Sequence, residues 1–218
     1  MFFGSTALFK LKCQPAVGVI SQTTHISCSI VSLTDPKPIS MNSLLTENKP
    51  CFIFQPYVNR MTGDSRFKVE NGPSLQLHNM AISDEGGYWY HIRTSLGIEQ
   101  VKFTINVTAK YSNLIITLMQ KEMVDGEHAD LYCNASGGYP AGTIHWFDQS
   151  NTNRTKSATL QNTQEIDGLF TLSSKLSFQT FATLWAPFIC VFLNNKYEEE
   201  GENTSDLEKK GDYCLFYL

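Results

Sequence analysis

The amino-acid sequence predicts an all-β chain that folds as two β-sandwiches in tandem. Its 218 residues exceed the roughly 100 residues of one such sandwich and accommodate two. Short segments of alternating apolar and polar residues recur between turn-forming residues, as in β-strands. In the second half, Trp146 follows Cys133 by 13 positions (146 − 133), and Cys190 follows it by 57 (190 − 133). This spacing is typical of an immunoglobulin-like sandwich, in which a disulfide from strand B to strand F packs on a tryptophan of strand C.

Residues 112–208 are predicted to form a constant-type immunoglobulin-like domain, followed by a tail over residues 209–218. A bridge between Cys133 and Cys190 would close a loop of 57 residues (190 − 133), which contributes roughly 4 kcal/mol in the chain-entropy model. The sequence Gly137-Gly-Tyr-Pro140 predicts a turn at the B–C corner. Its Tyr-Pro peptide bond can adopt either the trans or the cis form. The expected strands A, B, C, E and F cover residues 112–120, 129–136, 143–148, 169–178 and 187–193.

Residues 8–108 are predicted to form a variable-type domain with a weaker signature. Ser83-Asp-Glu-Gly-Gly-Tyr88 matches the E–F corner of variable domains, in which the tyrosine closes a hydrogen-bonded turn. Arg66 and Asp84 are expected to form the ion pair that closes the bottom of such a domain. The expected strands include residues 26–30, 66–69, 75–80 and 101–107, which alternate apolar and polar side chains.

The first domain lacks the inter-sheet disulfide and the strand C tryptophan that are usual in this fold. Tyr90 stands where the strand F cysteine belongs, and Met41 stands where the strand C tryptophan belongs. Cys28 is therefore expected to have no bridge to strand F. Loss of such a bridge typically costs about 2–5 kcal/mol, of which aromatic burial by Tyr90 offsets a part. The remaining cysteines leave two pairings open, Cys28–Cys51 and Cys13–Cys51.

Cysteine content and glycosylation sequons favour a secreted or cell-surface protein. The chain has six cysteines together with strand-type sequence. A net charge of −4 and no basic stripe argue against a nucleic-acid partner. Residues 1–9 lack the pattern of a signal peptide, and no apolar run is long enough for a transmembrane helix. The chain is accordingly interpreted as a fragment or shortened isoform of a membrane-anchored protein, or as a secreted one. The predicted N-glycosylation sites are Asn106, Asn134, Asn153 and Asn203.

The arrangement of motifs resembles the T-cell costimulatory ligands and butyrophilins, in particular the family of ICOS ligand and its paralogues. The resemblance covers residues from about 10 to 205. It depends on the corner Asp84–Tyr88 in the first domain, and on Leu131–Pro140, Ile144–Trp146 and Leu169–Leu176 in the second.

This resemblance implies a cell-surface ligand on the external side of the plasma membrane. Its first domain would bind an ICOS-type receptor on T cells through the sheet of strands G, F, C and C′, and its second domain would act as a spacer. The alternatives are a generic adhesion or immune-receptor ectodomain and a secreted decoy isoform. A homodimer is a further option.

Strand alternation identifies side chains that could bind such a partner. If Tyr88 and Tyr90 point inward, the residues between and after them on strand F point outward, as do alternate residues of strand G. Tryptophan and arginine dominate binding energy at protein interfaces, so an outward Trp89 beside Arg93 is a candidate anchor. Alternatively, the C–C′ hairpin or a second copy of the chain covers Trp89. The candidates are Trp89, His91, Arg93, Gln100 and Lys102, with Phe52, Phe54 and Tyr57 as weaker members of the same face.

No sequence motif indicates an enzyme active site, a cofactor or a metal site. The chain has no Gly-x-Ser-x-Gly elbow, phosphate loop or His-Glu-x-x-His sequence. The one local cluster, His128 with Asp125, Glu127 and Asp130, precedes strand B and is interpreted as a solvated turn. We therefore expect a non-enzymatic protein that functions by binding another protein.

Overall fold

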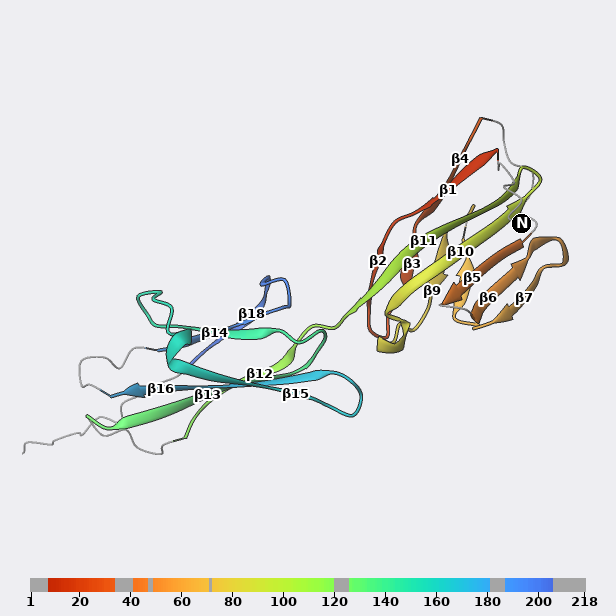
Figure 1. Ribbon diagram of the computed structural model, residues 1–218. Coiled ribbons are helices and arrows are strands. Elements are labelled where there is room, and N and C mark those ends of the chain that lie inside the picture. The colour runs from red at the N-terminus through yellow and green to blue at the C-terminus, as the bar shows by residue number, and fades with distance from the viewer. Residues whose placement is uncertain are drawn as a thin grey trace, which may run out of the picture. The chain divides into compact units, whose positions relative to one another are not determined.

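The computed structural model describes residues 8–33, 41–46, 49–70, 72–119, 126–180 and 187–205. The chain divides into two compact units, Met1–Thr108 and Ala109–Leu218 (Figure 1). The predicted tail over residues 209–218 and Cys214 lie outside the described residues.

The described strands of the first unit form two facing layers of a variable-type sandwich. One layer is a six-stranded sheet in the order β2-β11-β10-β5-β6-β7, which corresponds to strands A′, G, F, C, C′ and C″. The other layer contains the three-stranded sheet β3-β9-β8 and the pair β1-β4. The strand bounds are β1 Phe9–Cys13, β2 Ala16–Val19, β3 Thr24–Ile26, β4 Cys28–Ser32, β5 Met41–Thr46, β6 Lys49–Gln55, β7 Arg60–Gly63, β8 Phe67–Val69, β9 Leu75–Leu77, β10 Gly86–Thr94 and β11 Gly97–Thr108. Two 3₁₀ turns, Pro56–Val58 and Ile82–Asp84, lie between them.

Strand B of the first unit is divided, although the sequence predicts one continuous strand over residues 26–30. The break falls at Ser27, between β3 and β4. Ser74 occupies the break, because its hydroxyl accepts a hydrogen bond from the Cys28 N–H at 3.1 Å and donates one to the Cys28 carbonyl at 3.1 Å. A side chain thus satisfies both backbone groups of Cys28. β4 leaves the β3-β9-β8 sheet and pairs with β1 instead.

The structure forms a disulfide between Cys13 and Cys28, so both pairings proposed from the sequence are wrong. Antiparallel pairing of β1 with β4 places the two cysteines directly opposite each other, with 4.1 Å between their Cα atoms. The prediction that Cys28 is not bridged to strand F is confirmed. Cys51 lies on β6 in the opposite layer. Burial raises the pKa of its thiol to about 11.

Tyr90 fills the place of the missing strand F cysteine. Its side chain is fully buried, at 0% exposure. Its hydroxyl has no hydrogen-bond partner among the described residues, and burial raises its pKa. A buried hydroxyl without a partner costs about 1–3 kcal/mol, which reduces what the buried ring contributes.

The predicted E–F corner and its ion pair are both confirmed. The Tyr88 hydroxyl donates to the Asp84 carbonyl at 2.8 Å, and its ring stacks on Phe103 at 5.7 Å between centroids. The Arg66 guanidinium binds both carboxylate oxygens of Asp84, at 2.7 and 2.8 Å. Arg66 also bonds Asp64, and these hydrogen bonds lower the pKa of the Asp64 carboxyl. The corner and the ion pairs therefore close the lower end of the sandwich together.

The described strands of the second unit form the predicted constant-type sandwich. A four-stranded sheet, β12-β13-β16-β15, has the order A-B-E-D, and a three-stranded sheet, β14-β17-β18, has the order C-F-G. The expected strands agree with the observed ones apart from their ends. The bounds are β12 Ser112–Leu118, β13 His128–Gly138, β14 Thr143–Phe147, β15 Ala158–Gln164, β16 Phe170–Gln179, β17 Ile189–Leu193 and β18 Glu199–Thr204, with a 3₁₀ turn at Thr155–Ser157.

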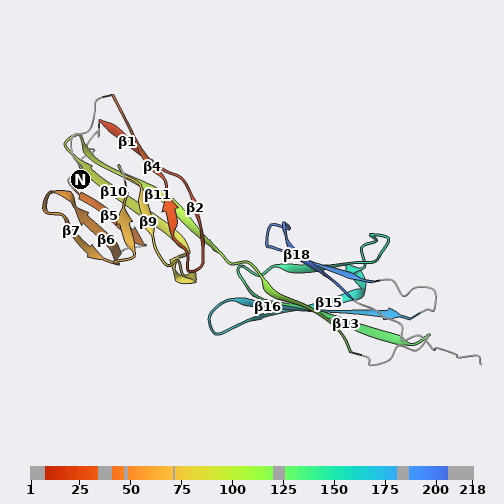
Figure 2. The same ribbon diagram turned by 180° about the vertical axis from the view of Figure 1, so that it is seen from behind.

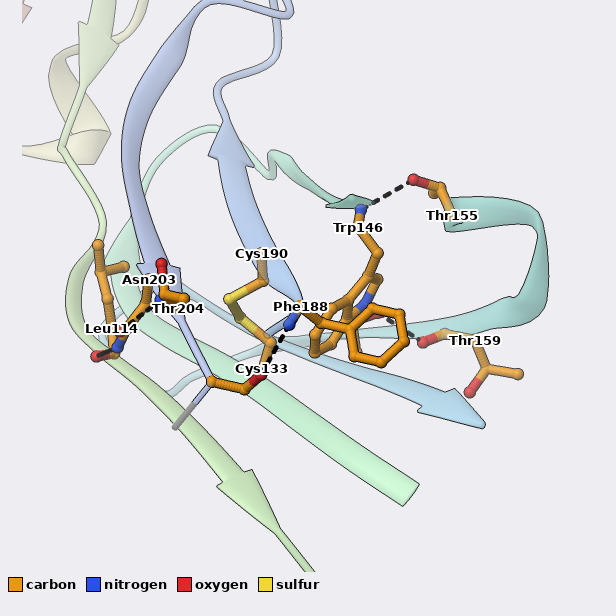
Figure 3. Close-up of a disulfide and its surroundings, with 11 residues drawn as sticks. Leu114, Cys133, Trp146, Thr155, Thr159, Phe188, Cys190, Asn203 and Thr204 are labelled. Atoms are coloured by element: carbon orange, nitrogen blue, oxygen red, sulfur yellow. Dashed lines mark hydrogen bonds between the residues drawn. A yellow bond between two sulfur atoms is a disulfide. The ribbon is translucent and has the colours of Figure 1, made fainter. Parts of the chain in front are cut away.

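The predicted disulfide and its tryptophan lie at the centre of the hydrophobic core of the second unit. Cys133 and Cys190 form a disulfide between the two sheets, and Trp146 lies directly opposite Cys190 on the neighbouring strand (Figure 3). All three side chains are fully buried. The indole N–H of Trp146 donates to the Ser174 hydroxyl at 2.9 Å, and that hydroxyl donates to the Thr159 carbonyl at 3.0 Å. The polar atom of the tryptophan is therefore satisfied inside the core.

The packing around Tyr111 requires glycine at two positions at one end of the second unit. Its buried ring lies against Gly138, and its hydroxyl accepts a hydrogen bond from the Gly142 N–H at 2.8 Å. A Cβ atom at Gly138 would overlap the Tyr111 ring, and one at Gly142 would overlap the Leu193 carbonyl. The Tyr139–Pro140 bond in this corner is cis.

Candidate functional site

The outer face of strands β10 and β11 carries the residues predicted to bind a partner. Along β10, Tyr88, Tyr90 and Ile92 are buried in the sandwich, so the alternate side chains point away from the core. Trp89 is 39% exposed, which is high for a tryptophan in the middle of a strand. Arg93 is exposed and His91 is half-buried. The assumed inward direction of Tyr88 and Tyr90 is therefore what the structure shows.

The register between β10 and β11 brings the candidates together. The two strands run side by side (Figure 1), and Trp89 lies opposite Lys102 while His91 lies opposite Gln100. The Lys102 ammonium lies 5.9 Å from the centre of the Trp89 ring, within the range of a cation–π interaction. This contact holds the indole and the cation beside each other at the surface.

The face carries positive charge near the tryptophan. Lys102 and Arg93 are both exposed on it. Burial lowers the pKa of His91 below its usual value, so its imidazole is neutral at neutral pH. The face therefore presents the exposed Trp89 ring together with two cationic side chains on the same pair of strands.

The face also contains two apolar residues that the sequence analysis did not identify. Ile98 lies opposite Arg93 and is 52% exposed, near the turn that joins the two strands. On β6, Ile53 lies in register with Ser43 of β5, which in turn lies opposite His91. Both could have been found by applying the same alternation to β6 and to the start of β11.

Phe52 is not part of the face, which corrects the sequence prediction. Its side chain is fully buried and packs on Phe67, with 5.8 Å between ring centroids. Phe54 is two positions further along the same strand and half-buried, so alternation directs it to the same inner side. The side chain of Tyr57 lies outside the described residues. Aromatic composition alone did not distinguish the two faces of this strand.

The four sequons differ in how available their side-chain nitrogens are. Asn106 and Asn153 are exposed, whereas Asn134 and Asn203 are half-buried. The Asn203 amide nitrogen donates to the Leu114 carbonyl at 2.9 Å, from strand β18 to strand β12 (Figure 3). A glycan on this nitrogen would compete with a contact that joins the two sheets.

Mapping of N-glycans should therefore find Asn106 and Asn153 occupied and Asn203 largely unmodified. The measurement is peptide mass spectrometry of the chain secreted from mammalian cells, before and after enzymatic deglycosylation. Asn153→Gln should remove one glycan mass, and the matched variant Asn203→Gln should leave the mass of the sugars unchanged. Full occupancy at Asn203 would show that the hydrogen bond to Leu114 does not limit modification.

The acidic cluster near His128 takes part in pairing within the sheet. Asp130 accepts a hydrogen bond from the Ser177 hydroxyl at 2.6 Å and pairs with Lys175 at 2.8 Å. Asp125, which belongs to the same predicted cluster, lies outside the described residues. Within the described ranges, no three His, Cys, Asp or Glu side chains are grouped so as to hold a metal ion. Nor does any helix found there have the length and apolarity to cross a membrane.

The second unit matches a known domain family. Residues 114–194 match the family described as the CD80-like C2-set immunoglobulin domain. With the two observed sandwiches, the match indicates a chain of tandem immunoglobulin-like domains, the second of which is similar to C2-set domains.

Curated relatives with sequence similarity include cell adhesion molecules. Cell adhesion molecule 1 of Homo sapiens is 32% identical over 159 residues, which cover 71% of this chain and 34% of the relative. Cell adhesion molecule 2 of Xenopus tropicalis is 30% identical over 108 residues, which cover 49% of this chain and 24% of the relative. The chain thus spans about a third or less of the length of these relatives.

Solved structures of similar fold include bovine butyrophilin and a chain of a complex that contains ICOS. Bovine butyrophilin superposes with a TM-score of 0.74 at 16% identity, covering 91% of this chain and 98% of that one. A chain from the complex of ICOS with ICOS-L and an anti-ICOS-L VNAR domain superposes with a TM-score of 0.61 at 15% identity, covering 88% and 98%. At these identities the similarity shows the shared tandem fold.

Proposed function

We propose that the chain is an extracellular recognition ectodomain that binds a protein partner through the outer face of β10 and β11. The observation that carries this proposal is Trp89, exposed in mid-strand and held beside the Lys102 ammonium. A large exposed indole on a rigid sheet provides contact area at little entropic cost, and tryptophan is enriched among the residues that dominate binding energy. The role is binding and not catalysis.

The chemistry of the face indicates the kind of surface that it fits. Trp89 and Ile98 supply apolar area, and Lys102 and Arg93 add positive charge around it. A complementary partner presents an apolar pocket bordered by carboxylates. Such a pair associates faster at low salt, because charges at the rim of an interface act mainly on the association rate.

The finer proposal is a cell-surface ligand that binds an ICOS-type receptor on T cells and modulates their activation. It is supported by the fold similarity to butyrophilin and to a chain of the ICOS complex, and by the corner motifs that the chain shares with that family. In this proposal the full-length protein is anchored on the external side of the plasma membrane, and the second domain acts as a spacer. The predicted glycans are consistent with that location.

Cell adhesion is the second candidate function. The observation that favours it is sequence similarity, since Cell adhesion molecule 1 is 32% identical over 159 residues. An adhesion partner would also use an exposed sheet face, so both candidate functions place the interface on β10 and β11. The nature of the partner separates them.

Binding to two sets of purified ectodomains tests the proposal. One set contains T-cell receptors of the ICOS type, and the other contains cell adhesion molecules together with this chain itself. Trp89→Ala should weaken binding to the true partner about 30-fold, as expected for loss of about 2 kcal/mol at an interface hot spot. The measurement is surface plasmon resonance with the folded chain.

The matched control is Val31→Ala, which shortens an exposed apolar residue on β4, in the opposite layer. It should change the affinity less than twofold. Equal affinities of Trp89→Ala and the unmodified chain for every partner that binds would place the interface elsewhere and overturn the proposal.

A further inference from the structure

Strand β15 stands out among the sheet edges of the second unit because, among the described residues, no hydrogen bond covers the backbone groups on its outer side. The other three edge strands of the same sandwich, β14, β12 and β18, are protected against pairing with a further strand. The Arg154 N–H bonds the Trp146 carbonyl of edge strand β14 at 2.7 Å, and the Thr155 hydroxyl accepts from the Trp146 N–H at 2.9 Å. Edge strand β12 has a bulge and receives the Asn203 amide on its Leu114 carbonyl. Edge strand β18 begins with two glutamates and carries a third. Natural sheets use such devices to prevent pairing with other chains.

The strand β15 is regular, exposed and uncharged. Its sequence, Ala158-Thr-Leu-Gln-Asn-Thr-Gln164, contains no charge, proline or glycine. It pairs with β16 along its whole length without a register shift. Residues 159–164 are exposed on both faces of the strand, and Leu160 is 39% exposed. The hairpin that joins β15 to β16 extends as a two-stranded ribbon (Figure 2).

The backbone groups that point away from β16 follow from the hydrogen bonds of that hairpin. The Glu165 N–H bonds the Leu169 carbonyl at 2.8 Å, so Glu165 faces β16. In an antiparallel pair this direction alternates along the strand. The N–H and C=O groups of Leu160, Asn162 and Gln164 therefore point outward, where they form a row of donors and acceptors for a further strand.

The charges that flank the strand favour one occupant. Lys156 precedes β15 and Glu165 follows it, and both are exposed. A second β15 laid antiparallel places the lysine end of each copy beside the glutamate end of the other. A parallel copy would bring like charges together, which is unfavourable. The strand is thus complementary to itself in the antiparallel direction.

We propose that β15 pairs antiparallel with β15 of a second copy of this chain, about a two-fold axis through Gln161. In this register Leu160 of one copy lies opposite Asn162 of the other, and Ala158 lies opposite Gln164. The outward N–H and C=O groups of both strands are satisfied, and Leu160 becomes covered. The two β12-β13-β16-β15 sheets join into one continuous sheet. This interface lies in the second domain and is independent of the face proposed to bind a partner.

Cysteine cross-linking of the two-domain chain tests the register. In the proposed dimer the two copies of residue 161 form a pair without mutual backbone hydrogen bonds, the geometry in which Cys13 and Cys28 are bridged within this chain. Under mild oxidation, Gln161→Cys should form disulfide-linked dimer about tenfold faster than Thr163→Cys, whose two copies would be about 13 Å apart along the strands. Peptide mapping should locate the new bond at residue 161. The unmodified chain, oxidised in parallel, reports the contribution of its own thiols.

Sedimentation velocity over a series of concentrations tests the interface without a covalent bond. The unmodified chain should show a reversible dimer. Gln161→Lys places two lysines opposite each other at the axis and should raise the dimer dissociation constant about fivefold or more. Circular dichroism checks that Gln161→Lys and the two cysteine variants are folded. A chain that stays monomeric at every concentration, or equal cross-linking of Gln161→Cys and Thr163→Cys, would overturn the proposal.

Discussion

A chain with Cys133 and Cys190 both replaced by alanine should lose about 4 kcal/mol of stability in its second domain. The bridge closes a loop of 57 residues, and the chain-entropy model assigns roughly that value to its constraint on the unfolded state. Removing the two sulfur atoms also opens space beside Trp146 in a fully buried cluster. For a domain of this size the transition temperature should fall by about 20 °C. Differential scanning calorimetry of both forms measures the shift.

The first domain provides the internal control for this experiment. Its core and its own disulfide, Cys13–Cys28, belong to a separate unit. Its unfolding transition should therefore keep its temperature in the variant. A single transition that shifts as a whole would show that the two domains unfold together, and an unchanged second transition would contradict the role given to the bridge.

Replacing Arg66 with alanine should destabilise the first domain by about 3 kcal/mol. The side chain of Asp84 is only 7% exposed, and Arg66 neutralises it through two hydrogen bonds. Without the guanidinium, a largely buried carboxylate keeps the hydrogen bond that it accepts from the Ala81 N–H, at 2.8 Å. Breaking one side of a buried ion pair is strongly destabilising because the remaining charge stays desolvated. Urea unfolding followed by tryptophan fluorescence measures the loss.

Arg60→Ala is the matched control, because Arg60 is an exposed arginine on edge strand β7. It should change stability by no more than about 0.5 kcal/mol. Combining Arg66→Ala with Asp84→Asn should recover part of the loss, since the unpaired charge is then removed. If the double variant loses the sum of the two single effects, the ion pair does not act as a unit.

The second domain was predictable because its signals are local or have a fixed spacing. Cys133, Trp146 and Cys190 identify the sandwich, and alternation locates the strands around them. The corner at Tyr88 and its pairing of Arg66 with Asp84 were predictable for the same reason. One backbone geometry requires those residue types at those distances along the chain.

The Cys13–Cys28 bridge was missed because it depends on which strands become neighbours. The sequence predicts one continuous strand B, whereas in the structure the Ser74 hydroxyl bonds both backbone groups of Cys28, and β4 pairs with β1. A serine hydroxyl in that position has no recognisable pattern in sequence. Phe52 was misplaced for a related reason, since aromatic content does not reveal the phase of the alternation on β6.

From the amino-acid sequence alone one can predict the two sandwiches, the disulfide across the second and the alternation that exposes Trp89. These features depend on residue type and on spacing along one strand or across one fixed bridge. Three features became visible only in the folded chain: the partner of Cys28, the contact of Trp89 with Lys102 and the exposed edge of β15. Each depends on register and on which elements lie side by side, and those are set by the packing of residues far apart in the chain.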